Sequence, residues 1–514
     1  MLEPDFYPHA PQSVELRETH ISWVFLAGNL AYKVKKPLVL PFLDYGTVER
    51  RREMCHEEVR LNRRLAPRIY LRVVGVAGGE NYRLTAEDDA QAVEYAVEMR
   101  RVDEHRSLAE LAHSGGLEPA HIDAVAALLA RFHAEASVVP PTPAYMDALA
   151  ATLDENLATL RQAAEEAIDQ TRLEAAGHFT RAYLAARGER LEARADAGLV
   201  RDCHGDLRAE HVIVPEQGEI YIYDCIEFEP DLRRIDVAND IAFLVMDLAR
   251  LGAETPSLRL IDAYRRGGGD AGDEDLLPFF ASYRAWVRAK IACVRAQELE
   301  GQAPERERLW TEARDLISLG HRFAWRARRP LVLVVCGVSG TGKTTLARVV
   351  AGLSGWAHVS SDVVRKRLAG LSVTERGGEE LYSPERTIAT YRELGTVAAE
   401  HARRGDGVII DATFHLREER DAFRATLGHS TAPLLFVHCQ APTDALLARV
   451  AARERHQDRV SDAGVAVLER QLAEFEALND VPDRSRAELI SDAPPAEVAA
   501  RLEAIIDARL WTSS

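Results

Sequence analysis

The sequence predicts two domains, an α+β domain followed by an α/β domain built on a parallel sheet. A chain of 514 residues is too long for one ordinary core. Its first part mixes alternating, strand-like runs with long helical stretches. Its last part opens on a continuous apolar run, "LVLVVCG" from Leu331, which is typical of a buried parallel strand.

Composition indicates a globular protein of a reducing compartment. Acidic residues outnumber basic ones by 81 to 64, so a nucleic-acid contact would need a local basic cleft. The six cysteines form no C-x-x-C pair, and we find neither an apolar leader nor a run of about 18 apolar residues. We therefore expect a soluble, cytoplasmic protein with no membrane contact, no zinc site and no disulfides.

The first elements read as a strand pair and a helix. Residues 20–38 alternate like two strands joined at Gly28-Asn29, a good hairpin turn. A helix follows, with Thr47 as its N-cap and Pro67 after its end. Further strands are predicted at 69–76 and 92–102, helices within 108–194 and 231–323, and short strands and loops within 199–224.

We place the domain boundary near residues 325–330, where "HRFAWRARRP" gives way to the apolar run. This gives domains 1–327 and 328–514. Strand-like runs then recur at 407–411 and 433–438, separated by helical stretches, which is the βαβ rhythm of a parallel sheet.

A phosphate-binding loop (Walker A motif) follows the apolar run. "GVSGTGKTTLA" matches G-x-x-x-x-G-K-[ST], where glycines let backbone N–H groups surround a β-phosphate and the next helix adds its positive end. We expect Lys343 to neutralise β/γ oxygens and Thr344 to place a hydroxyl on Mg²⁺. The predicted nucleotide-binding residues are Gly337, Ser339, Gly340, Thr341, Gly342, Lys343, Thr344 and Thr345.

Charged residues beyond this loop favour a kinase over a motor. Asp362 follows a short strand-like run, and Arg365 lies one helical turn on. Such an acid can accept a proton from a substrate hydroxyl, and such an arginine can hold an anionic group. Asp411 ends the strand of "GVIIDATF", with Thr413 beside it, and is a candidate partner of Mg²⁺.

Arginines near the C-terminus form a candidate lid. They could close over the nucleotide and stabilise the transferring charge, although a solvated helix face would carry the same residues. The group is Arg449, Arg453, Arg455 and Arg459, of which we assign Arg453 and Arg459 to the nucleotide site.

This second part resembles the small P-loop kinases of the gluconate-kinase, polynucleotide-kinase and zeta-toxin type. The matching residues are "GVSGTGKTT", the D-x-x-R of Asp362 and Arg365, "IIDAT" and the arginine group, over roughly residues 331–510. The resemblance implies Asp362 as the base and Arg365 as a contact to the substrate or transition state. It leaves the acceptor open.

A second motif lies in the first part. "HGDLRAEH" follows H-G-D-x-x-x-x-N except at its last position, His211, and is followed by "IYIYDCIEF" and "DVANDIAFL". In this order the motifs resemble aminoglycoside phosphotransferases, choline kinases and related enzymes, which have a bilobal, protein-kinase-like fold. The resemblance implies that Asp206 orients or deprotonates the acceptor hydroxyl and that Asp224 is the principal Mg²⁺ ligand.

His211 departs from that pattern. The family asparagine binds Mg²⁺ through a hard amide oxygen, whereas a neutral imidazole is softer and suits Mg²⁺ poorly. Either His211 hydrogen-bonds the catalytic loop while Asp224 carries the metal, or the site has lost efficient transfer. Because Asp206 and Asp224 are both present, we favour an active site and keep His211 with Asp224 as a candidate metal residue.

The strand "AYKVKKP" is expected to supply the lysine that grips α/β-phosphates. Lys33 and Lys35 lie on the same side of a strand, and we favour Lys33 because it sits deeper in the apolar run. Its ion-pair partner would be Glu57 or Glu58, and Glu57 is the candidate carried forward. The backbone of residues 94–102 is expected to meet adenine.

The order of the two domains resembles bacterial tandem proteins described as bifunctional aminoglycoside phosphotransferase/ATP-binding proteins. We therefore expect an ATP- (or GTP-) and Mg²⁺-dependent kinase with two nucleotide sites, whose hydroxyl acceptor is a small molecule or a nucleic-acid end. The alternative is a P-loop kinase or NTPase regulated by a catalytically weak first domain. A plain NTPase or motor ranks lower.

Overall fold

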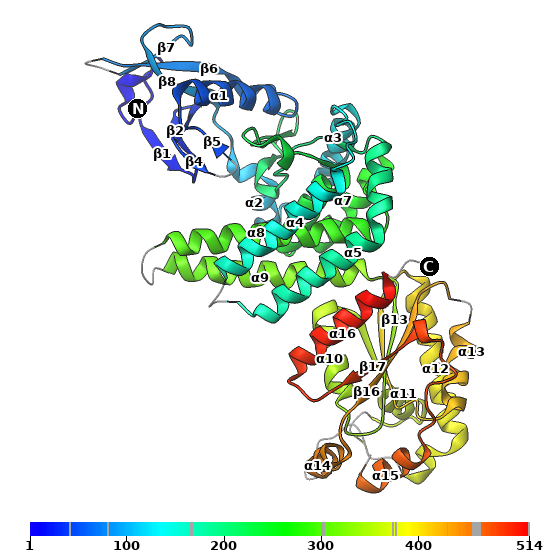
Figure 1. Cartoon of the computed structure of the whole chain (residues 1–514). Coiled ribbons are helices and arrows are strands. Elements are labelled where there is room, and N and C mark those ends of the chain that lie inside the picture. Colours follow the sequence, from blue (N-terminus) through cyan, green and yellow to red (C-terminus); the bar gives the residue numbers. More distant parts are fainter. Residues whose placement is uncertain are drawn as a thin grey trace. The chain divides into compact units, whose positions relative to one another are not determined.

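The computed structural model describes residues 1–40, 43–79, 82–164, 168–299, 304–372, 375, 378–428, 430–454 and 464–511. The chain folds into two compact units (Figure 1). Unit 1 comprises Met1–Tyr145 and Leu191–Asp273, and unit 2 comprises Met146–Arg190 and Glu274–Ser514. The predicted fold class is confirmed, with an antiparallel sheet and helices in unit 1 and a parallel five-stranded sheet in unit 2.

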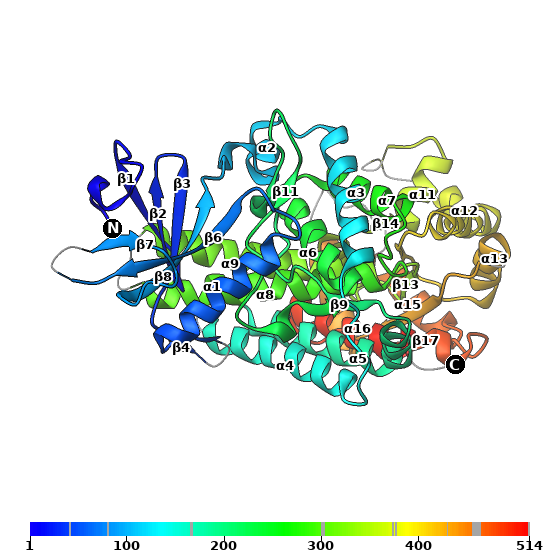
Figure 2. The ribbon, with the colours of Figure 1, turned by 90° about the horizontal axis from the view of Figure 1, so that it is seen from above.

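A six-stranded antiparallel sheet forms one part of unit 1, in the order β1-β2-β3-β8-β6-β7. The predicted hairpin turns at Gly28, whose φ of +63° favours glycine. The predicted helix packs along β6 and β8 (Figure 2) and is capped by the Thr47 hydroxyl, which accepts from Arg50 N. The elements are β1 (Val14–Glu18), β2 (Ser22–Ala27), β3 (Leu30–Lys35), β4 (Val39–Leu40), β5 (Leu43–Asp44), α1 (Val48–Asn62), β6 (Tyr70–Ala77), β7 (Arg83–Thr85) and β8 (Ala92–Arg100).

Helices and two short strand pairs form the rest of unit 1. Strand β9, which pairs with β12, precedes the H-G-D motif and the pair β10–β11 follows it, so the motif is held between two paired strands. Helix α6 is buried along nearly its whole length and packs behind this motif. The elements are α2 (Leu108–Ser114), α3 (Pro119–Glu135), β9 (Val200–Asp202), β10 (Val212–Ile213), β11 (Tyr221–Ile222), β12 (Arg234–Asp236), α6 (Val237–Arg250) and α7 (Glu254–Arg266).

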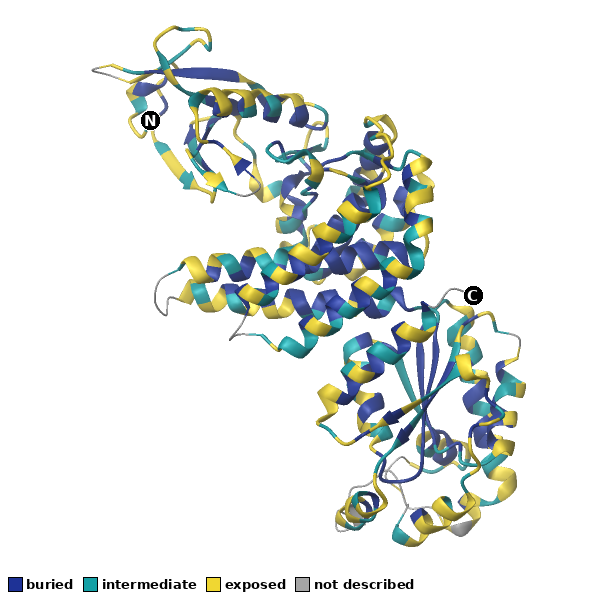
Figure 3. Cartoon of the chain, viewed as in Figure 1, coloured by how far each residue is buried: buried dark blue, intermediate teal, exposed yellow. Residues whose placement is uncertain are grey.

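The sheet of unit 2 is parallel, in the order β14-β15-β13-β16-β17. Residues 332–336 of the predicted apolar strand are fully buried, because helices cover both faces of the sheet (Figure 3). The strands are β13 (Val332–Cys336), β14 (Ala357–Ser360), β15 (Val408–Asp411), β16 (Leu434–Gln440) and β17 (Arg486–Ile490).

Side chains of the central strand alternate between two cores. Leu333 and Val335 pack with helices α10 and α16, whereas Val332 and Val334 pack with α12 and α13. The helices around this sheet are α10 (Lys343–Ser354), α11 (Ser361–Leu368), α12 (Pro384–Arg403), α13 (Arg417–Leu427), α14 (Thr443–Glu454), α15 (Val465–Glu474) and α16 (Pro495–Leu510).

Four further helices lie in unit 2 wholly or for most of their length: α4 (Tyr145–Ala163), α5 (Gln170–Asp196), α8 (Leu276–Glu298) and α9 (Pro304–Ala327). Trp325 at the end of α9 belongs to the core of the parallel sheet, with its ring centroid 5.2 Å from that of Trp356. The compact units therefore divide the chain differently from the sequential boundary at residue 327, and independent folding of 328–514 stays a prediction.

Within the described ranges, we find no helix that is both long enough and apolar enough to cross a membrane.

Candidate active sites in the two units

In unit 1, strand β3 directs both lysines toward Glu58 on α1. Lys33 Nζ lies 2.8 Å from Glu58 Oε1 and 2.7 Å from Asp224 Oδ1. Lys35 Nζ lies 2.7 Å from Glu58 Oε2 and also contacts Glu227. The Lys33 side chain keeps 12% exposure, whereas that of Lys35 is completely buried, so Lys33 is the more accessible of the two lysines and stays the predicted one.

The prediction that Glu57 pairs with the site lysine is corrected by this geometry. Glu57 binds Arg60 at 2.7 Å and Arg233 at 3.0 Å instead. Neighbouring helix positions point about 100° apart, so only one of two successive glutamates can face β3, and here it is Glu58.

Asp224 follows strand β11 in a left-handed backbone conformation, with φ of +66°. This conformation is uncommon for a non-glycine residue and clusters at functional sites. Burial alone would raise the pKa of Asp224, but the neighbouring basic groups, Lys33 foremost, together outweigh burial and hold that pKa well below its usual range. The Asp224 side chain is 39% exposed, and such an ionised, accessible carboxylate fits a hard divalent cation.

His211 fits a metal less well. Its Nδ1 lies 3.0 Å from the Asp206 carbonyl oxygen, and its Nε2 lies 2.9 Å from Arg208 Nη2 and 3.6 Å from Asp224 Oδ2. Arg208 Nε in turn donates to Asp206 Oδ2 at 3.0 Å. The imidazole thus hydrogen-bonds the catalytic loop, which was the first of the two alternatives raised by the sequence.

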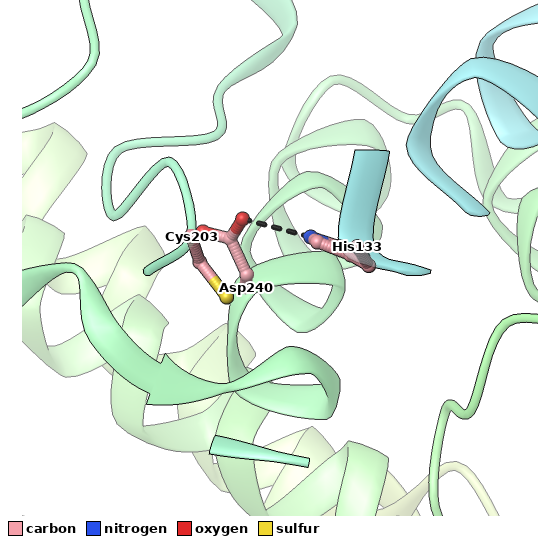
Figure 4. A group of neighbouring side chains, drawn as sticks. All are labelled: His133, Cys203 and Asp240. Carbon is pink, nitrogen blue, oxygen red and sulfur yellow. Dashed lines mark hydrogen bonds and ion pairs between the residues drawn. The ribbon is translucent and has the colours of Figure 1, made fainter. Parts of the chain in front are cut away.

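Behind the loop, His133, Cys203 and Asp240 form a buried cluster whose ligand atoms lie within 4.8 Å of one another (Figure 4). Asp240 accepts from His133 Nε2 at 3.0 Å and from the backbone N–H groups of His204 and Gly205 at 3.0 and 2.8 Å. Burial raises the pKa of the Cys203 thiol, which disfavours the thiolate that a metal requires. We interpret the cluster as the support that fixes the H-G-D turn.

The backbone of β8 pairs with strands on both sides, so it has little backbone to offer adenine. At the last residue of β8, Arg100 N donates to Ile69 O, and just past the strand Arg101 N donates to Asn29 O, both at 2.9 Å. A backbone contact with adenine would therefore have to come from Val102 or from the residues that follow it.

In unit 2, the phosphate loop joins β13 to α10. Gly337, Gly340 and Gly342 all have positive φ, and a Cβ on Gly337 would meet Cys439 O at 2.5 Å, so that position requires glycine. Lys343 Nζ donates to Val338 O at 3.3 Å, and Ser339 N donates to Gln471 Oε1 on α15 at 2.8 Å. Thr344 and Thr345 lie in the first turn of α10, as the motif predicts.

The carboxyl ends of three adjacent strands bring the other predicted groups to the loop's edge of the sheet. Asp411 pairs in register with Val335, two residues before Gly337, and with Ser360 at the end of β14. Asp362 and Arg365 follow in α11, with Arg365 Nη1 3.3 Å from Asp362 Oδ1. Parallel strands that end at one edge form the usual ligand crevice of such sheets.

Arg365 is 8% exposed, and its guanidinium lies 4.8 Å from the ring centroid of Tyr382. Among the residues that the structure describes, its Nε has no hydrogen-bond partner, so this buried cation retains a donor there.

Of the arginine group, Arg449 packs against the back of the phosphate loop. It donates to Gly340 O at 3.4 Å and to Ser491 O at 3.0 Å. Arg455 and Arg459 lie outside the described residues, as does the side chain of Arg453. Their assignment to the nucleotide stays a prediction.

Four residues that contact the candidate sites were not predicted from the sequence: Gln471, Glu227, Arg208 and His358. His358 Nε2 lies 3.2 Å from Asp411 Oδ2. Most of these contacts join residues far apart in the chain and leave no local pattern. Arg208 is the exception, because a cation two residues after the catalytic aspartate stands within the quoted motif.

The fold and the loop define unit 2 as carrying a P-loop kinase domain, and residues 332–478 match the family described as an AAA domain. The chain belongs to the same family as the uncharacterized protein Rv2004c of Mycobacterium tuberculosis. The two are 32% identical over 465 residues, which cover 89% of this chain and 90% of that protein.

Other relatives cover parts of the chain. A probable gluconokinase of Schizosaccharomyces pombe is 28% identical over 147 residues, 28% of this chain and 72% of its own. A choline/ethanolamine kinase family protein from Mesorhizobium loti, known from its crystal structure, is 13% identical, with a TM-score of 0.37, and covers 63% of this chain and 96% of its own.

Proposed function

We propose that unit 2 transfers the γ-phosphate of ATP to a hydroxyl of an anionic small molecule. The observation that carries this proposal is the order of groups along one sheet edge: phosphate loop, Asp411, then Asp362 with Arg365. Lys343 and the loop amides would hold the triphosphate, Thr344 and Asp411 would hold Mg²⁺, and Asp362 would receive the acceptor's proton. The bound cation would neutralise phosphate oxygens.

Arg365 supports an anionic acceptor. Among the described residues, its buried guanidinium is only partly satisfied by Asp362, and arginine suits planar carboxylates and phosphates. Gluconate and adenylyl sulfate, the acceptors after which the gluconokinase relative and an adenylyl-sulfate kinase relative of Myxococcus xanthus are named, are therefore suitable first probes.

We further propose that unit 1 is a second ATP site with its own phosphotransfer chemistry. Lys33 would reach the phosphates, Asp224 would hold the divalent cation, and Asp206 would orient the acceptor hydroxyl. The Lys33–Asp224 and Lys33–Glu58 contacts support this assignment, since they gather the phosphate lysine and the metal acid at one place.

The test is transfer of labelled γ-phosphate from ATP to gluconate, adenylyl sulfate and uncharged glucose by the full chain. We expect Lys343→Ala and Asp362→Ala to lower transfer to the anionic acceptor by roughly 100-fold or more. Arg501→Ala, which removes an exposed cation of unit 2 paired with Asp492, should leave transfer unchanged. Equal transfer to glucose would contradict an anionic acceptor. Unchanged transfer in Lys343→Ala would contradict the unit 2 site.

The same assay separates two active units from a regulatory unit 1. If unit 1 transfers phosphate, Asp206→Ala abolishes a part of the labelled product, or of phosphate release, that survives Lys343→Ala. If unit 1 only regulates, nothing survives Lys343→Ala.

A further inference from the structure

Arg208 occupies the middle of the unit 1 site. Its side chain contacts three groups of the catalytic loop: Asp206 Oδ2 at 3.0 Å, His211 Nε2 at 2.9 Å, and the Glu210 carboxylate. These carboxylates raise the pKa of Arg208 despite its burial, so the guanidinium is permanently charged. A fixed cation therefore lies beside the residue that would orient the acceptor.

The contact with His211 fixes what that imidazole can do. Guanidinium nitrogens only donate hydrogen bonds, so His211 Nε2 is the acceptor and its lone pair is directed at Arg208. His211 Nδ1 then carries the proton and donates a hydrogen bond to the Asp206 carbonyl oxygen at 3.0 Å. A metal could reach Nε2 only by displacing a positively charged side chain.

We propose that Arg208, positioned by His211, supplies the positive charge that a second divalent cation would otherwise bring to the unit 1 site. Unit 1 then loads one divalent cation, on Asp224, and no metal on His211. The inference rests on the proposed ATP site of unit 1.

Charge requirements support this assignment. Phosphoryl transfer depends on neutralising phosphate oxygens, and arginine does so with a planar set of donors. Asp224 Oδ2 lies 3.6 Å from His211 Nε2, so the metal acid, the imidazole and the guanidinium form a continuous row. His211 is therefore a positioning residue, and Arg208 is the group that would meet the transferring phosphate.

An inhibitory role for Arg208 makes the opposite prediction. If Arg208 only blocked Asp206, removing it would raise turnover. If it supplies needed charge, Arg208→Ala lowers unit 1 turnover by about 100-fold, and Arg208→Lys retains part of it.

The metal itself provides a readout that does not depend on turnover. The full-length Lys343→Ala protein is loaded with Mn²⁺ and a non-hydrolysable ATP analogue, and pulsed electron paramagnetic resonance records whether an imidazole nitrogen coordinates the ion. Signals that vanish with Asp224→Asn belong to unit 1. We expect one such Mn²⁺ per chain with no nitrogen coupling that depends on His211.

Two variants sharpen this measurement. Arg208→Ala frees His211 Nε2, so nitrogen coupling should then appear and should vanish again with an added His211→Gln. Arg259→Ala, an exposed arginine paired with Asp123, is the matched control and should change nothing. The spectrum of the Lys343→Ala protein is recorded with Arg208 and His211 unchanged. Misfolding of a variant at either residue therefore cannot explain away nitrogen coupling seen in that spectrum.

The outcomes are distinguishable. Nitrogen coupling from His211 with Arg208 intact, a second Mn²⁺ in unit 1, or higher turnover in Arg208→Ala overturns the inference but leaves the ATP site in place. If no Mn²⁺–nucleotide signal responds to Asp224→Asn, the proposed function of unit 1 falls, and the inference falls with it.

Discussion

Lys33 Nζ lies 2.7 Å from Asp224 Oδ1, which joins a strand of the unit 1 sheet to a loop 191 residues further along the chain. The two opposite charges thus neutralise each other in this structure. At the proposed nucleotide site, a magnesium–triphosphate complex would bring one new partner for each of them.

The two lysines of β3 should respond differently to substitution. Lys35→Met leaves Glu227 without its buried ammonium and should lower the free energy of unfolding by about 3–5 kcal/mol. Lys33→Met should cost less stability, because Glu58 keeps Lys35 at 2.7 Å, yet it should remove nucleotide binding by unit 1. Denaturant unfolding and calorimetric titration measure the two effects. A larger stability loss in Lys33→Met would reverse the assignment.

Gln471 should compete with nucleotide for the phosphate loop. Its Oε1 accepts from Ser339 N at 2.8 Å, where a phosphate oxygen is expected. Gln471→Ala should tighten ADP binding to unit 2 by roughly 2–10-fold, the worth of one net hydrogen bond, whereas Gln471→Glu should weaken it by charge repulsion. Fluorescent ADP titration reads both. Weaker binding in Gln471→Ala would show that Gln471 belongs to the nucleotide site.

Helix α16 should depend on one buried ion pair. Arg328 donates to both Asp507 oxygens at 2.7 and 2.8 Å, and its guanidinium lies 4.8 Å from the ring centroids of Phe179 and Trp325. Asp507→Ala removes the two hydrogen bonds of this charge, leaves Glu503 Oε2 at 3.8 Å, and should destabilise unit 2 by about 3–5 kcal/mol. Arg328→Met added to it should recover part of the loss. Additive effects in that double-mutant cycle would contradict the coupling.

The predicted boundary at residue 327 can be tested with fragments. Because Trp325 lies in the core of the parallel sheet, a fragment 304–514 should unfold at a higher temperature than 328–514. Losing a buried tryptophan costs about 3–5 kcal/mol. Equal melting temperatures would support the sequential boundary.

Burial of His321 should make unit 2 sensitive to acid. Burial lowers the pKa of His321 to about 4, below the ordinary value of 6.5. The unfolded chain binds more protons between those values, so this contribution to stability falls as pH drops from 6.5 to 4. Between pH 6.5 and pH 4, the free energy of unfolding should therefore fall less in His321→Gln than in wild type, by on the order of 3 kcal/mol.

Glu503 acts in the opposite direction, since burial raises the pKa of Glu503 to about 7. Its contribution is present below pH 4.5 and is lost as pH rises through 7. The free energy of unfolding of His321→Gln is therefore compared with that of wild type at each pH, by tryptophan fluorescence during urea unfolding. If His321→Gln and wild type have parallel profiles, the effect of His321 is refuted.

Local chemistry made much of both sites predictable. Glycines of the phosphate loop must adopt positive φ, and an all-apolar strand must be covered on both faces. Both requirements act on neighbouring residues, so both appear in the sequence as local patterns. No local pattern distinguishes Glu57 from Glu58, because tertiary packing decides which face of α1 is directed at β3. Likewise, Gln471 reaches Ser339 from 132 residues away, and no spacing rule records that contact.

The central claim is that the chain holds two independent magnesium–triphosphate sites. Calorimetric titration of the full chain with Mg²⁺ and a non-hydrolysable ATP analogue tests it most directly. We predict two bound nucleotides, one lost with Lys33→Met and the other with Lys343→Ala. A single nucleotide that survives Lys33→Met and disappears with Lys343→Ala would contradict the claim.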